Sequence, residues 1–363
     1  MKKFLIVFLA LIACVPLFGQ ETDVYTWYNP FEYIDKFEGQ GWSNNGYNRL
    51  PEKAKALVRE PVWKLSRHNA GINIRFTSNA EKITIRYQVK GNHGMPHMPP
   101  TSVSGVDLYV KKNSDWLWCR GRYQFKDTIR YDYKIDNTVF KNQEYQLYLP
   151  LYNSVKNLQL GVLEKDNIAF QTQKAKKPIV VYGTSIAQGA CASRPGMAWT
   201  SILARKLDEP LINLGFSGNG RLENELIELL TEIDASVYIL DCLPNLSPNE
   251  NRTKTEIQKR IINSVGLLKE KRPNTPILLV QHAGYSDGLV NNSRKDIYET
   301  LNSWMSETYN QLKSQDVHDL YMLSKEEIDL DNDAFVDGTH PTDLGMQQYA
   351  NAYEKILIHI KQK

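Results

Sequence analysis

The spacing of apolar residues changes once along this chain, near residue 165, and no single type of sheet accommodates both patterns. Before that point apolar and polar residues alternate with a period of two, as they do from Ile83 to Val89. Such alternation is typical of antiparallel strands that bury one face, and several in succession favour a sandwich. The alternating segments cover residues 72–76, 83–89, 106–110, 129–133, 145–149 and 158–162. The first part of the chain is therefore predicted to be an all-β sandwich.

Beyond residue 177 the apolar residues form short continuous runs separated by helical stripes. Runs this short and this apolar are typical of parallel strands that are covered on both faces. The stripes place apolar residues three and four positions apart, as in Leu226, Leu229, Leu230 and Ile233. The runs cover residues 178–182, 211–214, 237–240, 277–280 and 320–323. Their alternation predicts an α/β domain with a flavodoxin-like, doubly wound, five-stranded parallel sheet.

The first twenty residues have the pattern of an export signal. Lys2 and Lys3 precede an apolar run that is too short to span a bilayer. Cleavage near Gly19 would release the chain, whereas acylation of Cys14, which ends a lipobox-like Leu-Ile-Ala-Cys sequence, would anchor it to a membrane. Both outcomes stay open, and either predicts an exported protein, periplasmic or secreted.

These patterns divide the chain into three parts and a linker. Residues 1–20 are predicted to be a signal peptide, 21–165 the sandwich and 177–363 the α/β domain. The polar, basic stretch between the last two is predicted to be the linker.

Charge and cysteine content exclude several classes of function. Lys and Arg number 44 against 41 Asp and Glu, a formal net charge of +3. Nucleic-acid binding needs clustered basic residues, so the sequence gives no support for such a partner, nor for a polybasic membrane attachment. Cys119, Cys191 and Cys242 match no zinc-binding spacing and are expected to be buried free thiols, although one disulfide stays open.

Residues able to perform chemistry follow four of the five predicted parallel strands. Ser185 stands at the entry to a helix, as a nucleophile or as the helix N-cap. Gly218 lies in a glycine-rich loop, and Asn245 is either an amide donor or a turn residue. His340 comes three residues after Asp337, close enough for the carboxylate to hold one ring nitrogen. Since parallel strands end at one edge of a sheet, these residues are expected to gather there.

This order of Ser, Gly, Asn and Asp-x-x-His resembles the blocks of the SGNH (GDSL-like) hydrolases, over about residues 177–363. The resemblance implies a catalytic triad in which Ser185 is the nucleophile, His340 the general base and Asp337 its orienting carboxylate. It also implies an oxyanion hole made by the amides of Ser185 and Gly218 and by the side chain of Asn245. The chemistry implied needs no cofactor and no metal.

A second resemblance covers the first part of the chain. The sequences HMP at 97–99 and GVDLY at 105–109 are similar to the Gly-x-Asp-Leu-Tyr domain that precedes a subgroup of these hydrolases. The sequence departs from the wider family at Thr184, where Asp is usual, and at 244–246, where Pro-Asn-Leu replaces Gly-Asn-Asp. These departures leave the four group-defining residues in place.

Together the two resemblances imply a secreted serine esterase that hydrolyses short acyl esters, acetyl foremost, on small esters or extracellular carbohydrate. A thioesterase or other acyl hydrolase on the same scaffold, or a catalytically silent carbohydrate-binding protein, remains an alternative. Five tryptophans of the first part could stack on sugars, but aromatics in a sandwich are expected to be core. They are Trp27, Trp42, Trp63, Trp116 and Trp118.

Overall fold

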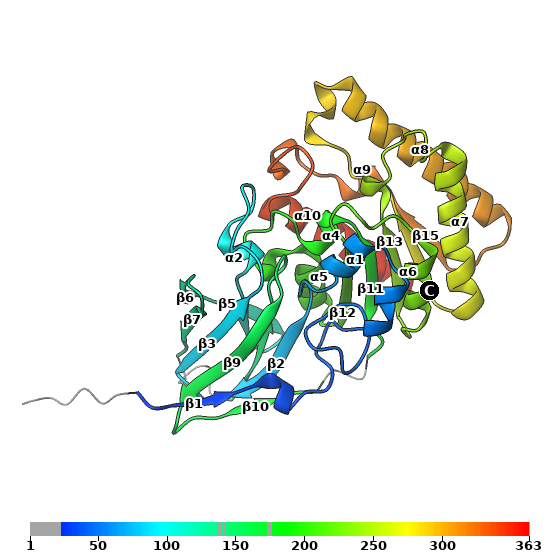
Figure 1. The fold of residues 1–363 in the computed structure, drawn as a ribbon. Coiled ribbons are helices and arrows are strands. Elements are labelled where there is room, and N and C mark those ends of the chain that lie inside the picture. Colours follow the sequence, from blue (N-terminus) through cyan, green and yellow to red (C-terminus); the bar gives the residue numbers. More distant parts are fainter. Residues whose placement is uncertain (1–22, 137–139, 141, 173–175, 363) are drawn as a thin grey trace, which may run out of the picture.

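The computed structural model describes residues 23–136, 140, 142–172 and 176–362, and its N-terminal part is a sandwich of two antiparallel sheets (Figure 1). Alternating residues of each strand enter the space between the sheets, as Ile83, Ile85 and Tyr87 do from one strand. One sheet has the order β1 (Tyr25–Tyr28), β9 (Val155–Leu163), β3 (Lys82–Val89), β7 (Ile129–Lys134) and β6 (Gly121–Gln124). The other has the order β10 (Ile168–Phe170), β2 (Asn73–Ser78), β8 (Gln143–Tyr148), β4 (Asp107–Lys112) and β5 (Asp115–Cys119).

The C-terminal part is a five-stranded parallel sheet between two layers of helices. Its order is β12 (Leu211–Gly215), β11 (Ile179–Gly183), β13 (Val237–Asp241), β14 (Ile277–Val280) and β15 (Leu320–Leu323), which is flavodoxin-like. Successive strand residues pack on opposite faces, so the strands are apolar throughout. One face packs on α5 (Trp199–Leu207) and α10 (Asp343–Lys361). The other packs on α6 (Asn224–Thr231), α7 (Lys254–Lys271) and α8 (Asn292–Ser314).

The first part of the chain also supplies core to the α/β domain. Between β1 and β2 the chain forms η2 (Glu52–Ala56) and α1 (Glu60–Leu65). Ala54 and Val62 from these helices pack in the same apolar cluster as α6 and α7. The Arg49 guanidinium is buried and donates to the carbonyl oxygen of Gly215 at 2.5 Å, at the end of β12. The two parts therefore share a core along this edge, rather than being joined by a linker alone.

The Gly-x-Asp-Leu-Tyr motif forms the other contact between the two parts. Asp107, at the start of β4, is buried and accepts hydrogen bonds from the Arg194 guanidinium and from the Gly196 N–H. Tyr109 accepts from the same guanidinium, and Arg205 of α5 lies 4.0 Å from its ring centroid. The Gly-x-Asp-Leu-Tyr motif thus binds α5 and the segment that precedes it, across the interface between the two parts.

The predicted fold class is confirmed, and two finer expectations fail. Strand β10 lies within the stretch predicted to be a linker, because it pairs with β2. None of the five tryptophans expected in the sandwich core is buried, and Trp118 is 48% exposed.

Cys119, Cys191 and Cys242 are buried and unpaired, as expected. The predicted signal peptide and Cys14 lie outside the described residues, and no helix within those residues is long and apolar enough to cross a membrane.

Asp241, the last residue of β13, makes the stability of the fold depend on pH. Burial raises the pKa of its carboxyl to about 7, although a hydrogen bond from the Tyr353 hydroxyl acts to lower it. Because the folded state holds this proton more tightly than the unfolded chain does, the contribution of Asp241 is largest below about pH 4. It declines as the pH rises from there to about 7, where the folded-state pKa lies.

The stability of Asp241→Asn relative to the wild type is therefore expected to rise between pH 4 and pH 8. The gain has an upper limit of about 4 kcal/mol in the free energy of unfolding, because asparagine keeps an acceptor for Tyr353 and never ionises. Urea unfolding of both proteins at pH 4, 5, 6, 7 and 8 measures it. Parallel stability curves for wild type and variant would contradict the assignment.

Candidate active site

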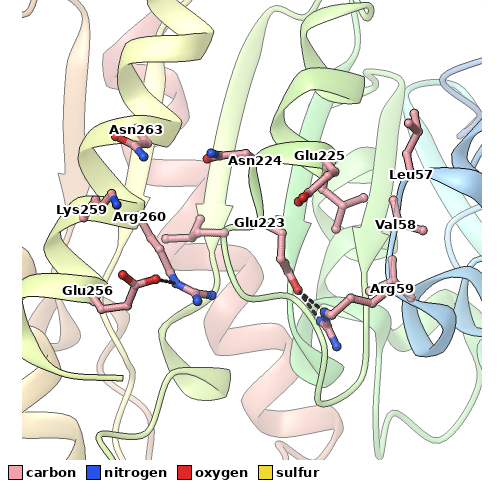
Figure 2. Close-up of a pocket in the computed structure, with 13 residues that line it drawn as sticks. Leu57, Val58, Arg59, Glu223, Asn224, Glu225, Glu256, Lys259, Arg260 and Asn263 are labelled. Carbon is pink, nitrogen blue, oxygen red and sulfur yellow. Dashed lines mark hydrogen bonds and ion pairs between the residues drawn. The ribbon is translucent and has the colours of Figure 1, made fainter. Parts of the chain in front are cut away.

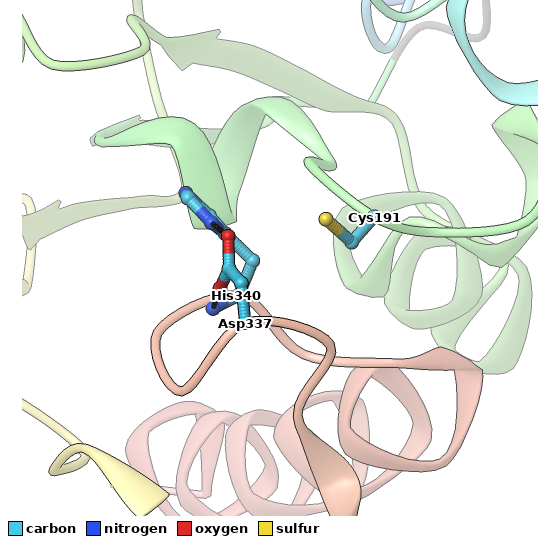
Figure 3. Close-up of side chains that lie close together, drawn as sticks. All are labelled: Cys191, Asp337 and His340. Atoms are coloured by element: carbon cyan, nitrogen blue, oxygen red, sulfur yellow. Dashed lines mark hydrogen bonds and ion pairs between the residues drawn. The ribbon is translucent and has the colours of Figure 1, made fainter. Parts of the chain in front are cut away.

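Three side chains from two loops meet at the carboxyl edge of the parallel sheet. Ser185 follows β11, and its Oγ lies 2.8 Å from Nε2 of His340. Nδ1 of His340 lies 2.7 Å from Oδ2 of Asp337, and both of these residues belong to the loop before α10. Figure 3 shows the imidazole and the carboxylate side by side. The structure thus joins Ser185, His340 and Asp337 into one hydrogen-bonded chain, although 155 positions separate the serine from the histidine.

Thr184, and not Ser185, caps the short helix α4 (Ser185–Gln188). Its hydroxyl oxygen accepts from the Ile186 N–H at 3.3 Å. Thr and Asp both serve as N-caps, which explains how threonine can stand where the family usually has aspartate. The turn also lies against Gly215, the last residue of β12. A Cβ at that position would lie 2.3 Å from the Gln188 nitrogen, so a larger side chain would collide with the turn. With the cap supplied by Thr184, the Ser185 hydroxyl is left to His340.

The loop that carries His340 is fixed by its own aspartate and by an arginine from α8. Oδ1 of Asp337 accepts from the N–H groups of Thr339 and His340, at 3.1 and 2.8 Å. Arg294 donates to the Gly338 carbonyl oxygen at 3.1 Å. Partial burial acts to raise the pKa of Asp337, but hydrogen bonds from the His340 side chain and backbone hold that pKa below its usual value. The carboxylate is therefore ionised at neutral pH, beside the ring that it orients.

Gly218 and Asn245 lie on the loops after β12 and β13, the two strands that flank β11. Gly218 has φ +68, and no atom lies within 4 Å of where its Cβ would stand. Its N–H has no acceptor among the described residues. The Asn245 side-chain oxygen accepts from the N–H groups of Asn219 and Gly220 at 3.1 Å each, in the amide orientation that satisfies both groups. This leaves the Asn245 NH₂ group as a donor on the opposite side of the amide.

Cys191 brings a thiol close to the Asp337–His340 pair, and the three side chains lie within 4.8 Å of one another (Figure 3). Burial raises the pKa of Cys191 to about 12, and its thiol donates to the His97 carbonyl oxygen. A soft metal ion needs a thiolate and a free imidazole nitrogen. Here the thiol is protonated and both nitrogens of His340 are hydrogen-bonded. The cluster therefore fits proton transfer better than it fits a metal centre.

Two residues of the first part of the chain lie beside the Ser185–His340–Asp337 chain, and the sequence predicted neither contact. The His97 ring lies over that of His340, with centroids 6.2 Å apart and planes 28° from parallel. The Tyr152 hydroxyl donates to the Ser185 carbonyl oxygen at 3.4 Å. The sequence signal for His97 was its place in the HMP motif at 97–99. That motif indicated a family relationship, but it did not indicate a contact with His340. The N-terminal part thus forms one wall of the site.

A cavity of 350 Å³ lies elsewhere, between α1 and the helices α6 and α7 (Figure 2). Arg59 and Glu223 form an ion pair on one side of it, and Arg260 pairs with Glu256 on the other. None of the predicted site residues lines this cavity. It is therefore separate from the Ser185–His340–Asp337 chain.

Comparison with known proteins agrees with this geometry. A family model described as the GDSL-like lipase/acylhydrolase family matches residues 176–358. A second model, described as the N-terminus of SGNH-hydrolase-type esterases, matches residues 25–168. Among curated proteins there was no significant match.

Among solved structures, a GDSL-like lipase from Bacteroides ovatus is 32% identical, with a TM-score of 0.85 over 93% of this chain and 98% of that chain. A salicylyl-acyltransferase from a tetracycline biosynthetic pathway shares the fold, at 15% identity and a TM-score of 0.73 over 93% and 98%. So does a family two carbohydrate esterase from Clostridium thermocellum in complex with cellohexaose, at 11% and 0.52 over 80% and 92%. The chain therefore belongs to the GDSL-like lipase/acylhydrolase family, with the N-terminal domain of SGNH-type esterases, and is a carboxylic ester hydrolase.

Proposed function

We propose that this protein removes short acyl groups, acetyl foremost, from carbohydrate by way of an acyl-enzyme on Ser185. The observation that carries the proposal is the continuous hydrogen-bonded chain from Ser185 Oγ through His340 to Asp337, with links of 2.8 and 2.7 Å. Such a chain serves to move a proton off a hydroxyl and to stabilise the imidazolium that forms. A carbohydrate-binding protein without turnover has no need of it.

The reaction follows from these contacts. Ser185 Oγ attacks the ester carbonyl carbon while its proton passes to Nε2 of His340, and Asp337 stabilises the resulting imidazolium. The negative charge on the carbonyl oxygen is met by the N–H groups of Ser185 and Gly218 and by the Asn245 NH₂ group. The C–O bond breaks, and His340 returns the proton to the leaving alcohol. Water, deprotonated by His340, then cleaves the acyl-enzyme and regenerates Ser185.

The choice of carbohydrate is supported by resemblance of fold and by the setting of the site. The carbohydrate esterase that binds cellohexaose has the same fold. Gly218 faces open space, because no atom lies within 4 Å of where its Cβ would stand. For this substrate to be reached, residues 1–20 would act as an export signal, with release near Gly19 or anchoring at Cys14. Mass spectrometry of the mature N-terminus distinguishes these two outcomes.

The proposal is tested by offering the purified protein matched acetyl ester, thioester and amide compounds, together with acetylated and deacetylated xylan. Release of acetate from the ester and from acetylated xylan is expected, with a mass gain of one acetyl group on Ser185 when the reaction is quenched early. Preference for the thioester would replace the proposal with a thioesterase. Binding of xylan without acetate release from any compound would leave a silent binding protein.

Asn245 gives a prediction that separates a donor role from a structural one. Asn245→Asp keeps the oxygen that accepts from Asn219 and Gly220 and removes the NH₂ donor. Removing one oxyanion donor typically costs about 100- to 1,000-fold in kcat, so a loss of at least this size is expected. The melting temperature should stay near that of the wild type. Ester hydrolysis at an undiminished kcat would remove Asn245 from the oxyanion hole.

A further inference from the structure

One face of the molecule gathers positive charge that the overall composition conceals. It is the outer face of the sheet β1-β9-β3-β7-β6, which points away from the α/β domain, because the other sheet packs on α5 (Figure 1). Side chains two positions apart on a strand share a face, so alternating basic residues accumulate there. A groove of 610 Å³ runs over this face. Its basic lining residues are Lys82, Arg120, Arg122, Arg130 and Lys134.

Two carboxylates line the same groove, and each already has a partner. Asp23 lies 2.9 Å from the Lys82 ammonium, and Asp132 lies 2.8 Å from the Arg130 guanidinium. The other three basic residues are exposed, and within the described part of the chain no carboxylate pairs with them. They are Arg120, Arg122 and Lys134. The groove therefore carries three positive charges without a counter-charge from the described residues.

The groove continues around the edge strand β6 into a second one of 430 Å³. The two share Arg120, Arg122 and Tyr133 in their linings. The second groove adds two aromatic side chains that are unusually exposed, Trp118 at 48% and Tyr123 at 54%. Exposed aromatic rings beside unpaired guanidinium groups offer flat apolar surface and anion binding in one place.

Contacts connect this second groove with the active site. Thr101 lines the groove and donates to the Ser193 carbonyl oxygen at 2.8 Å. Ser193 in turn donates to Asp343, three residues after His340. Aromatic contacts take a parallel route, since Tyr123 lies against Phe125, and Phe125 lies against His93 in the loop that also carries His97. These contacts join the lining of the second groove to the segments that carry His97 and His340.

We propose that these two grooves bind an acidic polysaccharide through its uronic-acid carboxylates and sugar faces. Arginine forks pair bidentately with carboxylates, and rings such as Trp118 and Tyr123 pack on the apolar faces of sugars. The inference rests on the proposed function for the carbohydrate nature of the substrate, and adds that the chain is anionic and is held by the N-terminal domain. An acyl group on such a chain would be presented to Ser185 while neighbouring uronates occupy the grooves.

Affinity electrophoresis of the full chain in gels containing polygalacturonate tests the proposal. Fully methyl-esterified pectin serves as the neutral counterpart, and dextran sulfate, duplex DNA and vesicles with anionic lipid as other anions. Polygalacturonate is expected to retard the wild type, and the esterified polymer to have little effect. Replacing both Arg120 and Arg122 with alanine should weaken binding about tenfold, as expected for two solvent-exposed charge pairs. Lys355→Glu, an exposed change on α10 of the α/β domain, should weaken it far less.

Hydrolysis of a small acetyl ester by the double variant should equal that of the wild type, since neither arginine lies at the triad. This readout reports folding and keeps the two proposals apart, because polysaccharide binding is measured without turnover. Equal retardation by polygalacturonate and esterified pectin, or an undiminished affinity of the double variant, would overturn the inference. So would stronger binding to dextran sulfate, DNA or lipid vesicles than to polygalacturonate.

Discussion

Replacing Ser185 with alanine is expected to abolish ester hydrolysis, with a loss in kcat of about a millionfold. In the proposed mechanism the Ser185 hydroxyl forms the acyl-enzyme, and its oxygen lies 2.8 Å from the His340 nitrogen that takes its proton. Residual turnover would come from the oxyanion donors and from binding alone. The measurement is p-nitrophenyl acetate hydrolysis, corrected for the background reaction.

The same variant should fold normally, and the reason is local. The cap of α4 is Thr184, so alanine at position 185 removes no hydrogen bond that holds the helix. Ser303→Ala, an exposed change on α8, serves as the matched control for the loss of a hydroxyl. Circular dichroism should superimpose for all three proteins. If Ser185→Ala turned over ester at the wild-type rate, another nucleophile would have to be sought.

Asp337→Asn is expected to lower kcat about 10,000-fold while leaving the loop in place. Asparagine keeps the oxygen that accepts from the N–H groups of Thr339 and His340. Its NH₂ group would instead face Nδ1 of His340, which must then act as an acceptor. The ring proton would move to Nε2, and a protonated Nε2 cannot take the proton of Ser185.

Two measurements distinguish this tautomer effect from simple unfolding. The KM for a small ester should change little compared with kcat, because the carboxylate does not touch the substrate. Asp333→Asn, an exposed acid in the preceding turn, should behave as the wild type in both constants. Equal losses for the two variants would point to disruption of the loop, and full activity of Asp337→Asn would remove the carboxylate from the mechanism.

Much of the fold could be predicted because periodicity reports burial directly. The alternation at 83–89 became β3, and the stripe from Leu226 to Ile233 marks α6. What escaped prediction has weak periodicity or depends on distant partners. Strand β10 is three residues long and exists because β2 offers it an edge, while η2 and α1 are short helices that pack on the α/β domain.

The residues of the candidate site likewise fall into those that the sequence indicated and those that it did not. Ser185, Gly218, Asn245, Asp337 and His340 were recognisable because each follows a strand in a known order of blocks. Arg294 and His97 were not, since an arginine within a helix and a histidine in a glycine- and proline-rich loop carry no local sign of what they contact. The tryptophans were misjudged for a related reason. Composition cannot tell which face of a strand a ring occupies, as for Trp118 on β5, nor that Trp42 and Trp63 lie outside the strands and pack against the α/β domain.

The sequence by itself determined the β-sandwich and the α/β domain, the family, and the residues that form the hydrogen-bonded chain at the sheet edge. Those properties depend on local spacing and on the order of motifs along the chain. Only the tertiary structure decided that Asp107 binds Arg194, that His97 lies over His340, and that a nearly neutral chain has a strongly basic groove. Contacts between distant segments and the sum of charge over one face depend on strand pairing and register, which bring together residues that the sequence keeps apart.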